Sequence, residues 1–328
     1  MGLRFSLKIT YFFATTIILF IIFFGNIEKL NIDIAYGMEK YTFSKTWGSS
    51  GTGDGQFMFP HSLAIDKYGN IYVTDTGNNR VQKFSSSGSF ITKWGEEGSA
   101  DGKFSQLHDI AIHPNGKFIY TVELDNHRVQ KFFPNGTFIS KFGYEKTGGD
   151  AEKRNPHQLY VDSSGNIYLS DRRNSEILKF KDNGEFIKKW GIEGKQNGGE
   201  FIKPHGIVLD SKDDVYVTDM GNSRIQKFDS DGNFITMWGS KGTGESKFSY
   251  SIPGIGIDSS EKIYVVDRGQ SIIQKFDSDG NFITMWGSKG SGIGEMNKPE
   301  DIAINLNNNN VYVTDTRNSR IIEFTLQQ

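Results

Sequence analysis

Residues 71–75 read IYVTD, and related five-residue stretches recur along the chain at a constant interval of 48 residues. The other copies are IYTVE at 119–123, IYLSD at 167–171, VYVTD at 215–219, IYVVD at 263–267 and VYVTD at 311–315. A longer stretch, IQKFDSDGNFITMWGSKG, occurs at 225–242 and again without any change at 273–290. Self-similarity at a fixed period of this length is typical of repeat architectures. The chain is therefore one unit written six times.

Within one repeat, alternating apolar residues and turn residues predict four short strands. In the first repeat these are SLAID, GNIYVTD, NRVQKF and SFITKWG, and glycines such as Gly69 and Gly88 mark the hairpin turns. A four-stranded unit cannot bury both of its faces alone, so neighbouring units must stack. Six antiparallel sheets arranged radially predict an all-β fold, the six-bladed β-propeller.

The two ends of the repeat region predict how the ring closes. The sixth repeat stops after Phe324 and lacks its fourth strand there, whereas YTFSKTWG at 41–48 is an unattached fourth strand at the other end. We expect this N-terminal strand to pair beside residues 320–324, which also covers an edge that would otherwise be open to aggregation.

One phenylalanine position recurs in all six repeats and is expected to form the packing between blades, because a buried aromatic ring removes a large apolar surface from water. Its members are Phe84, Phe132, Phe180, Phe228, Phe276 and Phe324.

Composition excludes several classes of function. The 328 residues contain no Cys, which rules out disulfides, thiolate nucleophiles and cysteine-based zinc modules. A formal net charge of -2 gives no global attraction to nucleic acid, so nucleic acid is not expected as a partner. The repeated lysines are spaced one per blade, and we expect a solvated circle rather than a phosphate-binding track. They are Lys83, Lys131, Lys179, Lys227 and Lys275.

The first 37 residues differ from the rest. Residues 9–25 carry no charge and follow Arg4 and Lys8, which predicts a hydrophobic helix that targets the chain to a membrane. A cleaved signal peptide and an uncleaved transmembrane anchor both fit. The basic flank favours a cytoplasmic N-terminus, so we expect the domain at 38–328 to be extracytoplasmic, either secreted or held at the membrane.

The full pattern of the repeat resembles the NHL repeat. It runs P-x-x-I-A-I-D, then G-N-I-Y-V-T-D, then N-x-R-[VI]-Q-K-F, then G-x-F-[IV]-x-x-W-G, and it covers residues 41–328. The family includes exported sensor domains, RNA- or protein-binding modules and one enzyme, the peptidyl-α-hydroxyglycine α-amidating lyase. The resemblance therefore implies the fold and leaves the activity open.

An acid ends the second strand of every repeat, as at Asp75, and an Arg five residues later pairs with it across the hairpin in most copies. We interpret this pair as structural. The third and fifth repeats replace that Arg with Glu176 and Ile272. Their hairpin loops carry arginines instead, as does the sixth, and loops on a rigid scaffold often hold binding residues. These loop arginines are Arg172, Arg173, Arg268 and Arg317.

Four of the six histidines occupy one position, the start of the first strand of a repeat. The first strand of a propeller blade is innermost, so these side chains should crowd the mouth of the central channel together with the loop arginines. The histidines are His61, His108, His157 and His205. We expect His61, His157 and the four arginines to form a ligand-binding face.

The same position resembles that of the zinc-binding histidines in the amidating lyase, which come from alternate blades in similar P-H-x-[IL] settings. Transferred to this chain, the resemblance implies a metal site of His108, His205 and Glu300 for zinc or another divalent ion. The other alternate set, His61, His157 and Pro253, is incomplete. The hairpin loops lack the Tyr that the lyase uses near its metal.

We therefore expect a monomeric binding module for a protein, peptide or glycan ligand, rather than an enzyme and with no certain cofactor. The alternative is a metal-dependent lyase or hydrolase that uses the His/Glu site at the channel mouth. An uncleaved N-terminal segment would add the membrane as a partner.

Overall fold

The computed structural model describes residues 39–144, 147 and 154–327. The N-terminal hydrophobic helix expected within residues 1–37, and the signal or anchor role assigned to it, lie outside these residues. Within the described part, no helix is long and apolar enough to cross a membrane.

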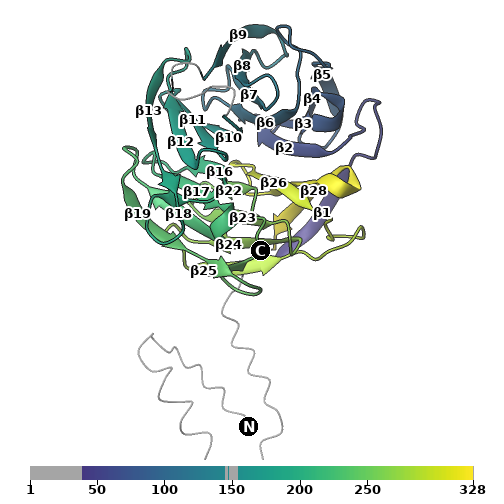
Figure 1. Cartoon of the computed structure of the whole chain (residues 1–328). Coiled ribbons are helices and arrows are strands. Elements are labelled where there is room, and N and C mark those ends of the chain that lie inside the picture. Colours follow the sequence, from purple (N-terminus) through teal and green to yellow (C-terminus); the bar gives the residue numbers. More distant parts are fainter. Residues whose placement is uncertain (1–38, 145–146, 148–153, 328) are drawn as a thin grey trace, which may run out of the picture. The chain divides into compact units, whose positions relative to one another are not determined.

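The described residues form six four-stranded antiparallel sheets, which confirms the six-bladed, all-β prediction (Figure 1). Blade one contains β2 (Pro60–Ile65), β3 (Ile71–Asp75), β4 (Arg80–Phe84) and β5 (Phe90–Trp94). Blade two contains β6 (Leu107–Ile112), β7 (Ile119–Glu123), β8 (Arg128–Phe132) and β9 (Phe138–Gly143). Blade three contains β10 (Pro156–Val161), β11 (Ile167–Asp171), β12 (Glu176–Phe180) and β13 (Phe186–Trp190).

The second half of the ring repeats this arrangement. Blade four contains β16 (Pro204–Leu209), β17 (Val215–Asp219), β18 (Arg224–Phe228) and β19 (Phe234–Trp238). Blade five contains β22 (Ile255–Ile257), β23 (Ile263–Asp267), β24 (Ile272–Phe276) and β25 (Phe282–Trp286). Blade six contains β26 (Pro299–Ile304), β27 (Val311–Asp315), β28 (Arg320–Leu326) and, in the outer position, β1 (Tyr41–Trp47).

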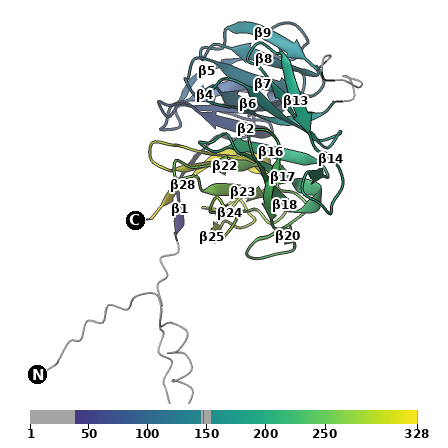
Figure 2. The same ribbon diagram turned by 90° about the vertical axis from the view of Figure 1, so that its left-hand side faces the viewer.

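β1 pairs antiparallel with β28, from Tyr41 opposite Leu326 to Trp47 opposite Ile321 (Figure 2). The ring of Tyr41 also stacks on Trp286 of blade five, with 4.1 Å between centroids. The two ends of the described chain therefore lie in one sheet.

The first strands of the blades line the central channel. β2, β6, β10, β16, β22 and β26 contact one another in a closed cycle, from β2 round to β26 and back to β2. Short 3₁₀ turns follow the second strand in three blades, at Thr76–Asn78, Met220–Asn222 and Thr316–Asn318. The start of the first strand pairs with the end of the second, as Pro60 does with Asp75, so the hairpin loops between second and third strands lie at the same end of the channel as these starts.

The core lies between blades. Each of six apolar clusters joins residues of two neighbouring blades, as where Phe84 of blade one packs with Tyr312 and Ile321 of blade six. All six members of the repeated phenylalanine position are buried, which confirms their predicted role.

The loops that connect successive blades carry short parallel pairings that the sequence patterns did not predict. Two are strand pairs, β14 (Ile192–Glu193) with β15 (Glu200–Phe201) and β20 (Ser240–Lys241) with β21 (Lys247–Phe248). These loops tuck one apolar side chain under the end of the fourth strand. A Cβ on Gly95, which has φ of 95°, would lie 2.3 Å from the buried ring of Phe104, so the Trp-Gly motif needs its glycine.

The repeated lysines do not form the solvated circle that we expected from their spacing. The Lys83 amine lies 4.8 Å from the ring centroid of Tyr72, and the Lys227 amine lies 4.8 Å from that of Tyr216. Lys275 is buried, with its side chain 3% exposed. Four of the five amines contact the tyrosine and an aspartate of their own blade, whereas that of Lys131 pairs with Asp182 of blade three. Each position thus offers both a cation–π and an ionic contact.

The 18 residues that are identical in blades four and five form matching hairpins. In both, the third strand pairs with the fourth in the same register, with Ile225 opposite Trp238 and Ile273 opposite Trp286. The hairpin β18–β19 is thus repeated by β24–β25 one blade further round the ring.

Candidate functional site

A β-bulge at the start of the first strand directs the histidines into the channel mouth. In β2, Pro60 pairs with Asp75 and Leu63 pairs with Val73, so β2 holds one residue more than its partner over this interval. β10, β16 and β26 carry the same irregularity directly after their prolines, and β6 carries it after Leu107. Bulges re-aim side chains beside functional sites.

Four imidazoles meet there. Ring centroids lie 3.7 Å apart for His61 and His108, 4.3 Å for His108 and His157, and 4.6 Å for His157 and His205. His108, His157 and His205 are buried, whereas His61 keeps partial exposure. The predicted gathering of four histidines from blades one to four is therefore present in the structure.

Backbone carbonyls fix the tautomer of two of these rings. The Nδ1–H of His108 donates to the carbonyl of His157 at 2.8 Å, and the Nδ1–H of His205 donates to the carbonyl of Pro253 at 3.0 Å. Because a carbonyl only accepts, Nδ1 carries the proton and Nε2 keeps its lone pair. By contrast, the buried Nδ1 atoms of His61 and His157 have no hydrogen-bond partner among the described residues.

The imidazoles are held neutral. Burial lowers the pKa of His108 to about 4, with the Arg172 guanidinium adding to the effect. Burial, and then the neighbouring imidazoles, likewise lower the pKa values of His61 and His205 well below the usual range. Neutral rings with free Nε2 lone pairs are the form in which histidine binds a metal.

Arginines of the hairpin loops reach the same mouth. Arg172 is half-buried, and its Nη1 lies 3.5 Å from Nε2 of His157. Arg268 forms an ion pair with Glu300 at 2.5 Å. Arg173 and Arg317 lie on the same set of loops but are exposed. The structure thus brings two of the four predicted arginines to the imidazoles and leaves two on the rim.

Glu300 is buried beside Arg268. Burial raises the pKa of Glu300 to about 7, although the Arg268 guanidinium opposes the rise. This carboxyl therefore changes charge near neutral pH unless a ligand or ion alters its surroundings.

The donor atoms that converge at the mouth differ from the metal ligands that the resemblance implied. The donor atoms of His61, His108 and His205 all lie within 4.8 Å of one another. Tetrahedral zinc with Zn–N bonds near 2.0–2.1 Å would need these nitrogens about 3.4 Å apart, so a modest inward movement of the rings suffices. Glu300, expected as the third ligand, is outside this trio because Arg268 engages its carboxylate. The geometry therefore favours His61 as the third ligand.

A layer of hydrogen-bonded polar groups lies directly behind the histidines. Asp301 accepts from Ser62 Oγ at 2.7 Å and from Gln158 Nε2 at 2.9 Å. Asp109 accepts from the backbone N–H of Leu159 at 2.6 Å. Burial raises the pKa of Asp301 to about 6, and burial together with Asp301 raises that of Asp109. In the sequence these aspartates directly follow His108 and Glu300, but the contact between Asp301 and Gln158 of blade three depends on the fold.

The acid that ends the second strand is structural, as we interpreted it. Asp75 accepts from Arg80 Nε at 2.7 Å and from the backbone N–H of Met58 at 2.7 Å, tying the hairpin to the incoming loop.

In blade three, the guanidinium partner of this acid is a residue that the sequence patterns did not single out. Arg154, two residues before Pro156, places Nη1 2.8 Å from Asp171 and 3.0 Å from Glu176. The sequence contains two features that together indicate this pairing. Glu176 stands where most repeats have Arg, and an Arg occurs shortly before the first strand of the same repeat.

Comparisons of sequence identify the repeat. The NHL repeat family matches residues 57–84, 154–180 and 201–228, and the DUF5128 family, described as a 6-bladed beta-propeller, matches residues 251–328. Protein lin-41 of Caenorhabditis elegans is 44% identical over 48 residues, which cover 15% of this chain and 4% of that protein. E3 ubiquitin-protein ligase TRIM71 of Rattus norvegicus is 44% identical over 45 residues, covering 14% and 5%. The chain thus spans a small fraction of the length of these relatives.

Solved structures share the fold at low identity. A streptogramin B lyase aligns with a TM-score of 0.56 and 15% identity, covering 81% of this chain and 78% of that chain. Virginiamycin B lyase of Staphylococcus aureus aligns with a TM-score of 0.59 and 13% identity, covering 88% and 100%. An auxiliary nutrient binding protein of Bacteroides thetaiotaomicron aligns with a TM-score of 0.65 and 13% identity, covering 88% and 77%.

At such identities the structural likeness shows the architecture and leaves the activity open. The six sheets, the matched repeats and these neighbours agree with one another. The chain carries NHL repeats and is a six-bladed β-propeller.

Proposed function

We propose that this protein is an exported binding module that holds an acidic group of a protein, peptide or glycan ligand at its histidine–arginine mouth. The observation that carries the proposal is the position of Arg172 and Arg268, which are half-buried beside neutral imidazoles. Guanidinium groups in such partly desolvated positions favour carboxylates and phosphates, which they bind through paired hydrogen bonds.

The surroundings of the mouth support an acidic ligand. Arg173 and Arg317 are exposed on its rim loops, and Lys203 is exposed two residues before His205. Glu300 is the acid that faces Arg268, and burial favours its neutral form. The mouth therefore offers excess positive charge although the whole chain carries a formal net charge of -2.

A peptide-binding assay tests this proposal. Fluorescein-labelled hexaglutamate should bind the purified chain, and Arg172→Gln combined with Arg268→Gln should weaken binding about tenfold or more, since each lost charge-assisted hydrogen bond costs on the order of 1.5–3 kcal/mol. A control with Lys93→Gln and Lys141→Gln removes two exposed positive charges on outer strands and should stay within about twofold. Equal losses in the two variants would show that only overall charge matters and would refute a specific mouth.

Export is a further part of the proposal and rests on the uncharged stretch at 9–25 with its basic flank. Cell fractionation tests it, with the chain expected outside the cytoplasm or at the membrane. A soluble cytoplasmic pool as the main fraction would contradict it.

A second candidate, a metal-dependent lyase or hydrolase, is favoured by the convergence of His61, His108 and His205. Their Nε2 atoms would hold zinc or another divalent ion, which when bound would supply a Lewis acid to polarise a substrate bond. The carbonyls of His157 and Pro253 would keep two of the rings oriented, as outer-shell partners of metal ligands do. Arg172 would orient an anionic substrate beside them.

Elemental analysis separates the candidates. The second predicts close to one equivalent of divalent metal in the purified chain, lost in His205→Ala and retained in His113→Ala, whose imidazole lies outside the cluster. Metal-free protein with an unchanged circular dichroism spectrum would remove the enzyme and leave the binding module.

A further inference from the structure

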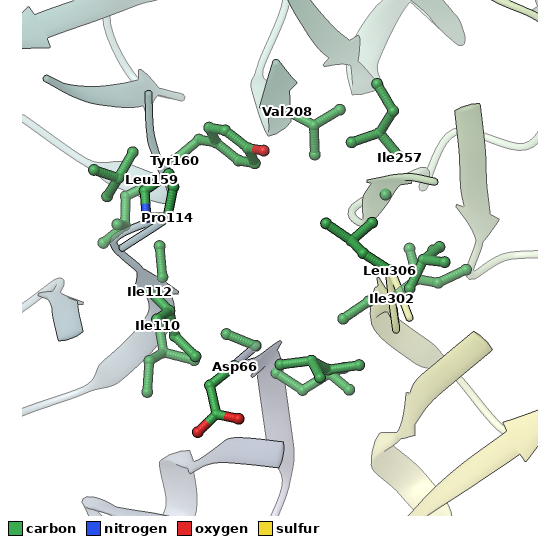
Figure 3. Close-up of a pocket in the computed structure, with 18 of the residues that line it drawn as sticks. Asp66, Ile110, Ile112, Pro114, Leu159, Tyr160, Val208, Ile257, Ile302 and Leu306 are labelled. Carbon is green, nitrogen blue, oxygen red and sulfur yellow. The ribbon is translucent and has the colours of Figure 1, made fainter. Parts of the chain in front are cut away.

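The end of the channel opposite the histidines contains a cavity of about 450 Å³ (Figure 3). The later residues of all six first strands line it, including Ile110, Leu159, Ile257 and Ile302. Small-molecule pockets are typically cavities of about 300–1,000 Å³ with a mainly apolar lining and a few polar groups. The cavity has that size and character, and neither the proposed binding function nor the metal candidate uses it.

The cavity exists because one repeated position is small. The third residue of SLAID and its counterparts, each paired with the tyrosine of the second strand, is small or medium-sized in five blades. It is Ala64 in blade one, and the equivalents are Ala111, Val208, Gly256 and Ala303. Blade three places Tyr160 at the equivalent position. A single large polar aromatic side chain thus faces five short ones.

The hydroxyl of Tyr160 is available to a ligand. No hydrogen bond joins it to another described residue, and Figure 3 shows the ring extending between the neighbouring blades with its oxygen directed toward the open space near Val208. The tyrosines of the second strands differ, since the Tyr216 hydroxyl donates to Asp210 at 3.1 Å and that of Tyr264 donates to Asp258 at 2.8 Å. Burial raises the pKa of Tyr160 to about 12, so its hydroxyl keeps its proton at neutral pH.

Both carboxylates of the lining already have partners, and its one lysine, Lys67, is exposed with its amine 5.2 Å from the ring centroid of Tyr68. Asp66 accepts from the backbone N–H groups of Tyr68 and Asn70, both at 2.9 Å, and from the Asn70 side chain at 2.8 Å. Asp301 is held by Ser62 and Gln158, as described above. A charged ligand held among the aliphatic side chains would lose its hydration without an unpaired buried counter-charge beside it, so the lining favours a neutral one.

We propose that this cavity binds a small, neutral, largely apolar molecule whose one hydrogen-bond acceptor meets the Tyr160 hydroxyl. The aliphatic walls supply the affinity because they leave water when the molecule enters, and the hydroxyl fixes its orientation. The site is independent of the histidine–arginine mouth at the other end of the channel.

Two fluorescent probes test the proposal on the full chain. The ketone 6-propionyl-2-(dimethylamino)naphthalene is neutral, responds to polarity and carries one carbonyl, and 2-(dimethylamino)naphthalene is its counterpart without that acceptor. The ketone should bind saturably with one site per chain and a blue-shifted emission. Tyr160→Phe should weaken the ketone about fivefold, the loss expected for one hydrogen bond, and leave the acceptor-free probe within about twofold.

Filling the cavity gives a second, separate readout. Ala303→Phe, or the smaller change Ala303→Leu if the first variant unfolds, should lower the affinity for both probes about tenfold or more. Ala100→Phe makes the same change on an exposed loop and should leave binding unchanged. The Arg172→Gln/Arg268→Gln variant should also bind the probes normally, which keeps this test separate from that of the mouth.

Absence of saturable binding, or binding that neither Ala303 variant reduces, would overturn the proposal. An equal effect of Tyr160→Phe on both probes would overturn the assigned role of the hydroxyl, and loss of probe binding in the arginine variant would assign the probe to the mouth instead.

Discussion

The two ends of the central channel are built by the two ends of the same six strands, yet they differ in how their chemistry is specified. At the histidine end, the first strand of five blades carries a bulge, and charges that occur in single blades, such as Arg172 and Arg268, complete the site. At the cavity end, the strands are regular and most of the lining is aliphatic, to which Tyr160 adds a phenol ring. In this repeat protein, the end with regular strands therefore forms a cavity, and the end with bulged strands carries the polar and charged groups.

The largest expected effect is a loss of stability when the guanidinium of Arg154, at the histidine end, is removed. Arg154→Ala leaves the buried Asp171 carboxylate without its guanidinium partner, which should lower the free energy of unfolding by about 3 kcal/mol. Urea denaturation measures the loss. Adding Glu176→Arg recreates the pairing seen at Asp75 and Arg80 and should restore at least half of it. A loss below about 1 kcal/mol, or no recovery, would show that blade three does not depend on Arg154.

The next effect is a pH dependence that belongs to the histidine end. The pKa of His108 in the folded chain is about 4, below its ordinary value, so the unfolded chain binds a proton below pH 6.5 that the folded chain does not. Stability is therefore lost as the pH falls from 6.5 toward 4. Between pH 7 and pH 5 this single group should cost about 2 kcal/mol. The Arg172 guanidinium lowers the pKa of His108 further, whereas the hydrogen bond to the backbone carbonyl of His157 raises it.

Comparison of wild type with His108→Gln isolates this term. In EDTA, the wild type should lose about 2 kcal/mol more than the variant between pH 7 and pH 5, because Asp301, whose raised pKa acts in the opposite direction, is present in both. Equal pH dependence in the two proteins would mean that His108 is not held neutral.

A smaller effect is expected at the cavity end. Val208 borders the cavity, so Val208→Ala should cost about 1 kcal/mol, whereas Val217→Ala, in the core between blades three and four, should cost about 2 kcal/mol. Thermal unfolding of the two variants measures the difference. A larger cost at Val208 would indicate that the cavity wall is packed as tightly as the core.

The smallest effect is expected on the rim of the histidine end. Arg173 is exposed, so Arg173→Ala should change the free energy of unfolding by no more than about 0.5 kcal/mol. Its effect on hexaglutamate binding should be weaker than that of Arg172→Gln, because exposed charges are screened by solvent and salt. A larger binding loss for Arg173 than for Arg172 would move the proposed site outward onto the loops.

The sequence predicted the features that recur. Six blades follow from the 48-residue period, the buried phenylalanines from their repeated position, and the gathering of histidines from their place at the start of each first strand. Such features can be predicted from the sequence because the repeated positions have the same packing environment in every blade.

Features that depend on one blade were harder to predict. The alternate-blade rule selected His108, His205 and Glu300, but His61 of blade one converges with the two histidines, and Arg268 holds Glu300. Arg154 takes the role that an arginine of the third strand has in most blades. The cavity beside Tyr160 depends on the smaller side chains that the other five blades have at the equivalent position. Such outcomes depend on side-chain directions and cross-blade contacts, which a linear pattern does not contain.

The matching hairpins of blades four and five have a consequence for how the chain assembles. Because residues 225–242 and 273–290 are identical, either hairpin carries the side chains that the other's neighbours require. A partly assembled chain can therefore pair strands one blade out of order and must release them before the ring is complete, a failure route typical of tandem repeats. The duplicated hairpin can therefore compete with the original for the same neighbouring strands during folding.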